Sequence, residues 1–470
     1  MDHEPAFHSR LSSAPPESAS EEVFNIRSFG AKGDGVHDDL PAYHAMVAAI
    51  NARKGGTAYF PEGVYFMDAY QRYNEGGIEG GTAQPVFSDC DGLRISGYRA
   101  KIDLRANFRR TPGDDRHPIS GIRIQRCSNF VIEGLEIDGN VDRLTREGPV
   151  GETWSHGIII ASSRHYTLRD LYVHHHATDG IGLGRTERRV VDEDVVLENV
   201  RSTHNARQAL SVLGVRRLRA TNCDFSHTGR VLPYGVFAPG AGVDIEPEGH
   251  GAVVDDCLFV NCRFENNAGG QVAVGYPTLT TDITFDRCRM TGPSGALDFS
   301  MIFTPNRGTL RNCHIDLDYG SLALSLGGKS DVTVDNCTIV FKKFGIVSLY
   351  DAPVLVKGCY LQCNAPQPLE VAAPYVINPR FRFIGNRVFR NAASFRPEIA
   401  GVADQASVIV AAECRDNRWE TDYVAPARAP NNHFYTDYSA TRIVRNERYA
   451  SPAYRPFLNA PVPRTAAYSR

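Results

Sequence analysis

The sequence lacks any apolar run long enough to cross a membrane as a helix. Its 470 residues carry a formal net charge of only −3, so no basic surface for nucleic acid is indicated. The first twenty residues are polar and have no apolar signal-peptide core. We therefore expect neither a membrane nor a nucleic-acid partner. We expect the chain to be cytoplasmic, or a mature secreted or periplasmic form whose signal was removed.

The eleven cysteines include no CxxC pair, which argues against a zinc site. Six of them recur at the same place in a repeated segment, at intervals of 39, 26, 25, 24 and 22 residues. Unpaired cysteine in an apolar context usually acts as a small core residue. The six are Cys223, Cys262, Cys288, Cys313, Cys337 and Cys359.

Helical periodicity is almost absent, and so is the regular leucine spacing of a leucine-rich repeat. Each repeat holds short β-branched strands, such as 331–340 and 344–350, between Gly, Asn and Asp. Repeat periods in the twenties are typical of solenoids. The sequence therefore predicts an all-β fold, a single-stranded right-handed parallel β-helix. Asparagines before four of the cysteines should form a structural hydrogen-bonded ladder: Asn222, Asn261, Asn312 and Asn336.

The sequence predicts three segments. Residues 1–22 are expected to be disordered or flexible, residues 23–425 to form the β-helix with an N-terminal cap over 23–67, and residues 426–470 to form an irregular tail or cap. The cap is needed because the end of a solenoid exposes core and unpaired backbone.

A short capping helix is expected within residues 38–56. Asp38 or Asp39 can cap its start, and Pro41 suits its first turn. Four apolar residues at helical spacing should cover the first coil: Tyr43, Met46, Val47 and Ile50.

Inward-facing apolar pairs align the second strand of each repeat. The pairs are Ile158/Ile160, Ile181/Leu183, Leu210/Val212, Val243/Ile245, Val272/Val274, Leu297/Phe299 and Leu322/Leu324. Residues between the members of each pair point outward. This alignment predicts an outward column of Gly182, Ser211, Asp244, Ala273 and Asp298.

The stretch "GAGVDIEPEG" (240–249) places Asp244, Glu246 and Glu248 on one face of a strand. Strand geometry predicts about 6–7 Å between Asp244 and Glu246, and about 9–10 Å between Asp244 and Asp298. Both spacings suit an inverting glycosidase, which needs room for a water between its acid and its base. Solvated surface charge is the alternative interpretation.

Other candidate site residues surround these acids. Arg207 is expected either to orient a carboxylate or anionic sugar, or to be a counter-ion that keeps Asp244 ionised. The loop 226–241 interrupts the repeat just before Asp244, and long loops on a rigid scaffold often carry function. The remaining candidates are Asp179, Gln208 and His156 at strand starts, Tyr234 and Phe237 in the loop, and Tyr276 beyond it.

The run His174-His175-His176 looks like a metal-binding tag. Adjacent residues of a strand point to opposite faces. We therefore expect no metal role for this run.

The stretch "VFNIRSFGAKGDGVHDDLPAYHAMVAAINARKGGTAYFPEGVYFM" (23–67) resembles the N-terminal signature of the pectate-lyase-like superfamily. That superfamily includes polygalacturonase-related hydrolases, polysaccharide lyases, alginate epimerases and phage tailspikes. The resemblance implies the β-helix, with the repeat pattern continuing to about residue 420. It specifies the fold more closely than the reaction.

Parts of the sequence are similar to the active-site motifs of polygalacturonases, and other motifs of that family are missing. "ATDGIGLG" (177–184) is similar to their Asn-Thr-Asp-Gly motif and places Asp179 where that family has a catalytic Asp. In "ARQALSV" (206–212), Arg207 and Gln208 stand where the family has an Asp pair, and no Gly-His-Gly or Arg-Ile-Lys follows. The acidic residues Asp244 and Glu246 appear one coil later instead.

Three functions follow as expectations, each with a polysaccharide or oligosaccharide partner. The first is a glycoside hydrolase without a cofactor, in which Asp244, Glu246 and Asp179 or Asp298 share the acid and base roles in a groove. The second is a polysaccharide lyase or related epimerase, which can hold Ca²⁺ at Asp244, Glu246 and Asp298. The third is a glycan-binding depolymerase of the phage-tailspike type, possible as a homotrimer.

Overall fold

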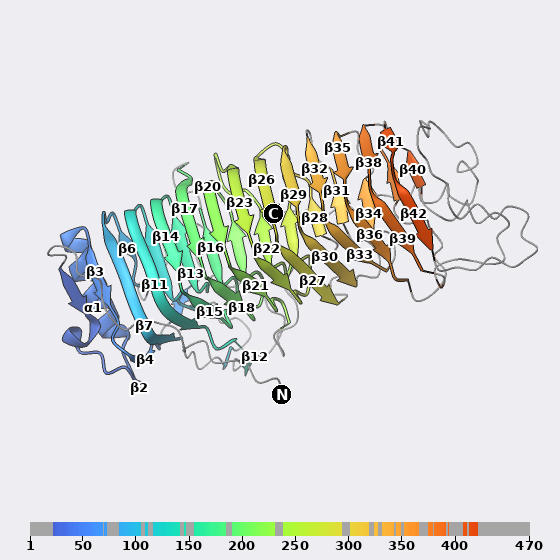
Figure 1. Ribbon diagram of the computed structural model, residues 1–470. Coiled ribbons are helices and arrows are strands. Elements are labelled where there is room, and N and C mark those ends of the chain that lie inside the picture. Colours follow the sequence, from blue (N-terminus) through green and yellow to red (C-terminus); the bar gives the residue numbers. More distant parts are fainter. Residues whose placement is uncertain are drawn as a thin grey trace, which may run out of the picture.

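The computed structural model shows a parallel β-helix whose coils follow one another along one axis (Figure 1). No helix in the described part of the chain is both long and apolar enough to span a membrane. The structure describes residues 22–68, 70–72, 84–104, 109–110, 116–141, 145–146, 155–184, 190–230, 238–293, 301–318, 324–327, 331–342, 345–348, 352–365, 375–378, 380–391, 393, 408–410 and 413–421.

A twelve-stranded parallel sheet forms one side of the solenoid. One short strand from each coil contributes to it, and each pairs with the strands of the coils before and after. Its strands are β6 (Phe87–Ser88), β10 (Ile122–Gln125), β13 (Ile158–Ala161), β16 (Ile181–Leu183), β19 (Leu210–Val212), β22 (Val243–Ile245), β25 (Val272–Val274), β28 (Met301–Phe303), β31 (Leu324–Leu326), β34 (Ile346–Ser348), β37 (Tyr375–Ile377) and β40 (Val408–Val410).

A 26-stranded sheet covers the other sides as two parallel runs, joined by the long strands β7 (Leu93–Asp103) and β11 (Ser128–Asp138). The first run continues through β14 (Arg164–Arg169), β17 (Asp192–Glu198), β20 (Val215–Thr221), β23 (Val254–Val260), β26 (Thr280–Asp286), β29 (Gly308–Arg311), β32 (Val332–Asp335), β35 (Val354–Lys357), β38 (Phe381–Ile384) and β41 (Glu413–Arg415). The second continues through β15 (Tyr172–His174), β18 (Arg201–Thr203), β21 (Asp224–Ser226), β24 (Arg263–Glu265), β27 (Arg289–Pro293), β30 (His314–Asp318), β33 (Thr338–Phe341), β36 (Tyr360–Cys363), β39 (Arg387–Arg390) and β42 (Arg418–Thr421).

The first turns of the chain form the cap at the blue end of Figure 1. They comprise β1 (Val23–Asn25), the 3-10 helix η2 (Ile26–Phe29), β2 (Asp34–Asp38), α1 (Leu40–Arg53), β3 (Gly56–Tyr59) and β4 (Gly63–Phe66). Two small ladders lie outside the main sheets: β5 (Tyr70–Arg72) with β9 (Arg116–Pro118), and β8 (Arg109–Arg110) with β12 (Thr145–Arg146).

Helix α1 confirms the expected cap. Asp38 Oδ1 accepts the Leu40 N–H at 3.0 Å, while Asp39 accepts the backbone N–H groups of Lys32 and Gly33 instead. Pro41 lies in the first turn, where a missing N–H costs nothing. The predicted stripe of Tyr43, Met46, Val47 and Ile50 is buried against the first coil.

The cysteine and asparagine ladders are structural, as predicted. All eleven cysteines are buried, and none of them forms a disulfide. Asn261 Nδ2 donates to Asn222 Oδ1 at 2.7 Å, and Asn336 Nδ2 donates to Asn312 Oδ1 at 2.9 Å. All four asparagines have φ between 51° and 57°, the left-handed conformation that asparagine tolerates better than most residues.

The inward pairs are confirmed through Val272/Val274 and are wrong after it. Strand β28 places Met301 and Phe303 inward, not Leu297 and Phe299. Strand β31 likewise uses Leu324 and Leu326, not Leu322 and Leu324. In both segments apolar residues alternate beyond the strand, so a slip by an even number of residues keeps the same face inward.

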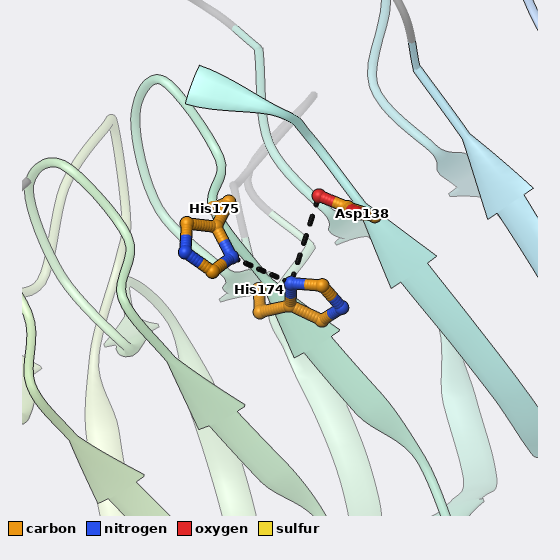
Figure 2. Close-up of side chains that lie close together, drawn as sticks. All are labelled: Asp138, His174 and His175. Atoms are coloured by element: carbon orange, nitrogen blue, oxygen red, sulfur yellow. Dashed lines mark hydrogen bonds and ion pairs between the residues drawn. The ribbon is translucent and has the colours of Figure 1, made fainter. Parts of the chain in front are cut away.

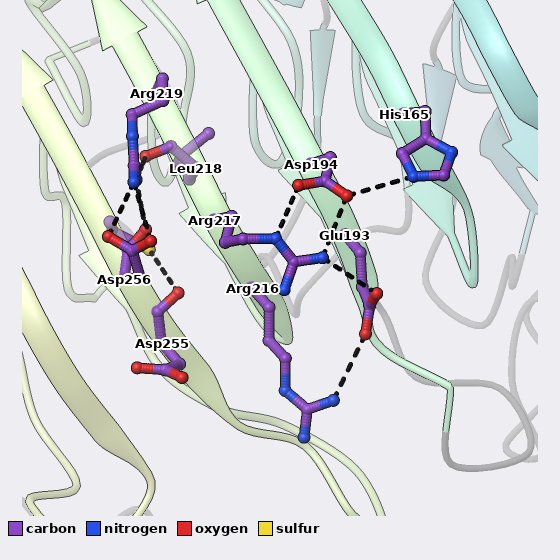
Figure 3. Close-up of polar contacts among 10 residues, drawn as sticks. His165, Glu193, Asp194, Arg216, Arg217, Leu218, Arg219, Asp255 and Asp256 are labelled. Atoms are coloured by element: carbon purple, nitrogen blue, oxygen red, sulfur yellow. Dashed lines mark hydrogen bonds and ion pairs between the residues drawn. The ribbon is translucent and has the colours of Figure 1, made fainter.

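Exposed ion pairs run across the outer face of the first run of strands (Figure 3). Asp194 lies 3.1 Å from His165 and 2.6 Å from Arg217. Glu193 contacts both Arg217 and Arg216, at 3.1 and 3.3 Å. Exposed pairs of this kind each contribute about 0–1 kcal/mol, so these ion pairs add little to the free energy of unfolding.

Candidate active site

An outward column of the twelve-stranded sheet carries the candidate site. Gly182, Ser211, Asp244 and Ala273 are register partners on β16, β19, β22 and β25, as predicted. Val243 and Ile245 flank Asp244 and point into the core, which directs the carboxyl group outward.

The fifth predicted member of the column is wrong. Ile302 of β28 is the register partner of Ala273, in place of Asp298. The strand lies four residues later than the sequence pattern indicated. Asp298 itself falls outside the described residues, as do Tyr234 and Phe237.

Asp179 and Arg207 form a buried ion pair beside this column. Arg207 Nε lies 2.8 Å from Asp179 Oδ1, and Arg207 Nη2 lies 2.7 Å from Asp179 Oδ2. Burial opposes ionisation of Asp179, but the charge and hydrogen bonds of Arg207 outweigh it and hold the pKa of this carboxyl well below its ordinary value. Asp179 is therefore an ionised partner of Arg207 and is poorly suited to exchange protons.

His156 supports the same pair from the preceding coil. Its Nδ1 lies 3.5 Å from Asp179 Oδ2, and its side chain is only 4% exposed. His156 therefore contacts Asp179 from a buried position, in which its side chain is not exposed to a polysaccharide.

Ser211 and Gln208 connect the ion pair to Asp244. Ser211 Oγ lies 2.8 Å from Asp179 Oδ2 and also contacts Gln208 Oε1, so its single proton serves one of the two oxygens or is shared. Gln208 Nε2 donates to Asp244 Oδ2 at 2.5 Å. Ser211 was not predicted as a site residue. Its signal was available, because it was the only hydroxyl among the five residues of the predicted outward column.

Asp244 is the carboxyl of this network whose pKa is raised. It is 6% exposed. Burial is the main cause that raises its pKa well above the ordinary value, and the charge and hydrogen bond of Glu246 raise it further, while Arg207 opposes the shift. Asp244 is therefore the group that stays protonated, contrary to the alternative in which Arg207 keeps it ionised.

Glu246 connects Asp244 to a tyrosine at the surface. Tyr276 Oη donates to Glu246 Oε1 at 3.0 Å, and the ring is 42% exposed. Burial, with the charge of Glu246 second, raises the pKa of Tyr276 to about 12, so the phenol keeps its proton near neutrality. Glu248, two residues further on, is exposed to solvent.

The charge of Glu246 raises the pKa of the Asp244 carboxyl, so the protonation states of the two groups are linked. Their predicted separation of about 6–7 Å stays a prediction. Glycosidases hold their two carboxyl groups about 5–9.5 Å apart, across the reacting sugar. The alternative calcium site at Asp244, Glu246 and Asp298 stays a prediction, because Asp298 lies outside the described residues.

The protein is a parallel β-helix with a polar site on one face. This class follows from the stacked coils, the buried carboxyl network and the helical cap. A family model described as "Right handed beta helix region" matches residues 120–301 and 234–365, which together cover more than half of the chain. A second model, "Rhamnogalacturonase A/epimerase, pectate lyase-like", matches residues 23–76. The chain belongs to the right-handed β-helix family and to the pectate-lyase-like superfamily.

Curated relatives match over a shorter part of the chain. Mannuronan C5-epimerase AlgE4 of Azotobacter vinelandii is 30% identical over 140 residues, which are 29% of this chain and 22% of that protein. Alginate lyase 7 of the same organism is 38% identical over 133 residues, 26% of this chain and 13% of that protein. The chain therefore spans less than a quarter of the length of either relative.

Solved structures share the fold at low identity. The N-terminal fragment of bacteriophage Phi29 gene product 12 superposes with a TM-score of 0.55 at 12% identity, over 89% of this chain and 73% of that one. The Agl-KA catalytic domain superposes with a TM-score of 0.50 at 13% identity, over 88% of this chain and 70% of that one. These similarities concern the β-helix alone.

Proposed function

We propose that the chain is a polysaccharide-active enzyme that abstracts the C5 proton of a uronate residue, as a lyase or an epimerase, with Asp244, Glu246 and Tyr276 as its reacting groups. The observation that carries the proposal is the connected unit of a protonated Asp244, Glu246 and the Tyr276 hydroxyl. The named activities of the relatives, mannuronan C5-epimerase and alginate lyase, support a uronate substrate.

A protonated Asp244 suits the binding of the uronate carboxylate. Removing the C5 proton moves negative charge onto that carboxylate, so catalysis needs a donor placed where the charge develops. A carboxylic acid kept neutral by burial can serve as that donor, because it adds a hydrogen bond without adding repulsion. Gln208 Nε2 holds Asp244 Oδ2 at 2.5 Å and orients the acid.

Glu246 and Tyr276 supply the proton transfers. Glu246 takes the C5 proton, and the electron pair of the C5–H bond passes onto the uronate carboxylate, which Asp244 stabilises. In elimination a C4=C5 double bond forms, the C4–O4 bond breaks, and the leaving oxygen takes the Tyr276 proton. In epimerisation the proton returns to C5 from the opposite side, and water supplies it there because Tyr276 lies beside Glu246. After elimination, the hydrogen bond of 3.0 Å between Glu246 and Tyr276 passes the proton back to the phenolate and restores the starting protonation.

Glycoside hydrolysis, the reaction favoured by the sequence, is the second candidate. One observation favours it: the raised pKa of Asp244 is what a general acid for a glycosidic oxygen requires. The named activities of the curated relatives, mannuronan C5-epimerase and alginate lyase, favour proton abstraction over hydrolysis.

A substrate panel tests the proposal. The purified chain is incubated with polymannuronate, polygalacturonate and a neutral glucan. New reducing ends, the ultraviolet absorbance of unsaturated uronate and the configuration at C5 by NMR are read in the same samples. Unsaturated product or inverted C5 supports the proposal. New reducing ends without either change support hydrolysis, and no change on any uronate polymer contradicts the proposal.

A further inference from the structure

We propose that Asp138, His174 and His175 form a binding site for a first-row divalent transition metal, with Zn²⁺ as the representative ion (Figure 2). The ligand atoms of the three side chains all lie within 4.8 Å of one another. The site is separate from the proposed reacting groups, and its test is independent of the proposed function.

The fold brings the three residues together at one corner of neighbouring coils. Asp138 ends β11 and His174 ends β15, and the two are register partners. His174 Nδ1 lies 3.6 Å from Asp138 Oδ1. His174 and Asp138 therefore face the same space from adjacent strands.

His175 joins them because the strand has ended. It has φ 54°, the left-handed conformation, so the alternation of faces stops at His174. His175 Nδ1 consequently lies 2.7 Å from His174 Nδ1. The sequence prediction of no metal role for this run assumed that both residues continue one strand. That assumption is wrong at His175.

Neighbouring side chains orient the ligand atoms. His174 Nε2 lies 3.3 Å from Glu136 Oε1, so a proton on Nε2 is held there and the lone pair of Nδ1 is directed toward His175 and Asp138. Metal-binding histidines commonly have this second contact with a carboxylate. Lys101 Nζ contacts Asp138 Oδ2, while Oδ1 accepts the Asn140 N–H at 2.9 Å and keeps a second lone pair for the side of His174.

The donor set selects the metal class. Imidazole nitrogens with one carboxylate oxygen suit Zn²⁺ and its neighbours rather than Ca²⁺ or Mg²⁺, which prefer oxygen. Bonds of about 2.0–2.1 Å in a tetrahedral site place ligand atoms about 3.3 Å apart. The nitrogen pair would open by roughly 0.6 Å and the Asp138–His174 pair would close slightly, which side-chain rotation can supply. Three protein ligands leave one position for water.

Binding would join the corner after β15 to β11 in the preceding coil. The segment that leaves this corner reaches Asp179, which is bound to Arg207. A ligand that binds only the native state raises the apparent stability of a protein, so a bound ion should stabilise the folded chain.

The experiment uses the full chain without an affinity tag, since a histidine tag would bind the same ions. Zn²⁺ is titrated against a competing chelating dye, and Co²⁺ is added separately to read its visible absorption. We expect one equivalent of Zn²⁺, tetrahedral Co²⁺ bands and a higher thermal midpoint with Zn²⁺. Glu136→Gln should weaken affinity about tenfold or more, and His175→Gln should weaken it further.

His227→Gln is the matched control. His227 occupies the same corner two coils later with φ 60°, and its ring stacks on His204 rather than on His175. The half-buried His175 is substituted rather than the buried His174, so that folding is retained. Binding of less than half an equivalent, or equal affinity in His175→Gln and His227→Gln, overturns the proposal.

Discussion

Gln208 Nε2 lies 2.5 Å from Asp244 Oδ2, and this hydrogen bond joins the corner before β19 to the outward face of β22. Through Ser211 the same network reaches the Asp179–Arg207 ion pair, and through Glu246 it reaches Tyr276. One end is an ionised, buried pair and the other is a protonated acid next to an exposed phenol. Variants of Asp244, Arg207 and Tyr276 separate these roles.

Asp244→Asn should lower the activity by at least about 100-fold on the polysaccharide that reacts in the substrate panel. The reason is that an amide replaces the acid that stabilises the developing charge. The shape is conserved, so the thermal midpoint should change little. In the unmodified chain activity should fall as the pH rises through the raised pKa of Asp244, since ionisation removes the donor. Initial rates across a pH series measure both effects.

The exposed Asp331→Asn is the control for a general effect of charge removal. Equal rates for Asp244→Asn and Asp331→Asn would contradict a catalytic role for Asp244.

Arg207→Gln should lower the free energy of unfolding by about 3–5 kcal/mol, because it leaves the carboxylate of Asp179 buried without its partner. The double variant Arg207→Gln/Asp179→Asn should recover much of this loss. Urea unfolding of the two single variants and the double variant gives the coupling energy. Additive losses would instead mean that Arg207 does not stabilise Asp179, and a role in binding substrate would gain support.

Tyr276→Phe should reduce the rate by about 10²–10⁴-fold, since it removes the proton that completes the reaction. The ring is partly exposed, so loss of its hydrogen bond to Glu246 should cost no more than about 1 kcal/mol of stability. Tyr360→Phe, in the outer wall, is the matched control. Unchanged kcat with a raised KM in Tyr276→Phe would reassign Tyr276 to substrate binding.

Asp192 should make stability depend on pH. Its carboxyl is fully buried, and burial raises its pKa from 3.8 to about 7, although Tyr166, Ser163 and Gly184 donate hydrogen bonds to it. Between about pH 4 and pH 7 the folded chain holds a proton that the unfolded chain has lost. Its contribution to stability is therefore present in full below pH 4 and is lost as the pH rises to 7, by about 1.4 kcal/mol per pH unit.

The measurement for Asp192 is urea unfolding from pH 4 to pH 8 in the unmodified chain and in Asp192→Asn. The difference between the two curves should fall with this slope and level off above pH 7. A constant difference over the whole range would show that Asp192 titrates alike in both states.

The fold was predictable because its ladders repeat in the sequence. The Asn-Cys segments around Cys223 and Cys337 mark one turn of each coil, and their hydrogen bonds follow from the left-handed conformation of the asparagines. The predicted strand register is wrong at Met301, because apolar residues continue to alternate with period two through that segment. Nothing local distinguishes Phe299 from Met301 as the inward residue.

The site was predictable only in part, for a similar reason. Strand alternation places Asp244 outward, but the partners of Asp244 depend on corner geometry that has no sequence period. The pairing of Arg207 with Asp179, and the hydrogen bond from Tyr276 to Glu246, each join residues 28 to 30 positions apart. The contact between His174 and His175 depends on the positive φ angle of His175.

The most direct test of proton abstraction is solvent deuterium exchange. Polymannuronate is incubated in D₂O with the unmodified chain and with Asp244→Asn, and deuterium at C5 and the C4=C5 double bond are read by NMR. We expect deuterium at C5, unsaturated product or both with the unmodified chain, and neither with Asp244→Asn. Chain cleavage with new reducing ends, no deuterium at C5 and no double bond would contradict it and would make Asp244 the general acid of a hydrolase.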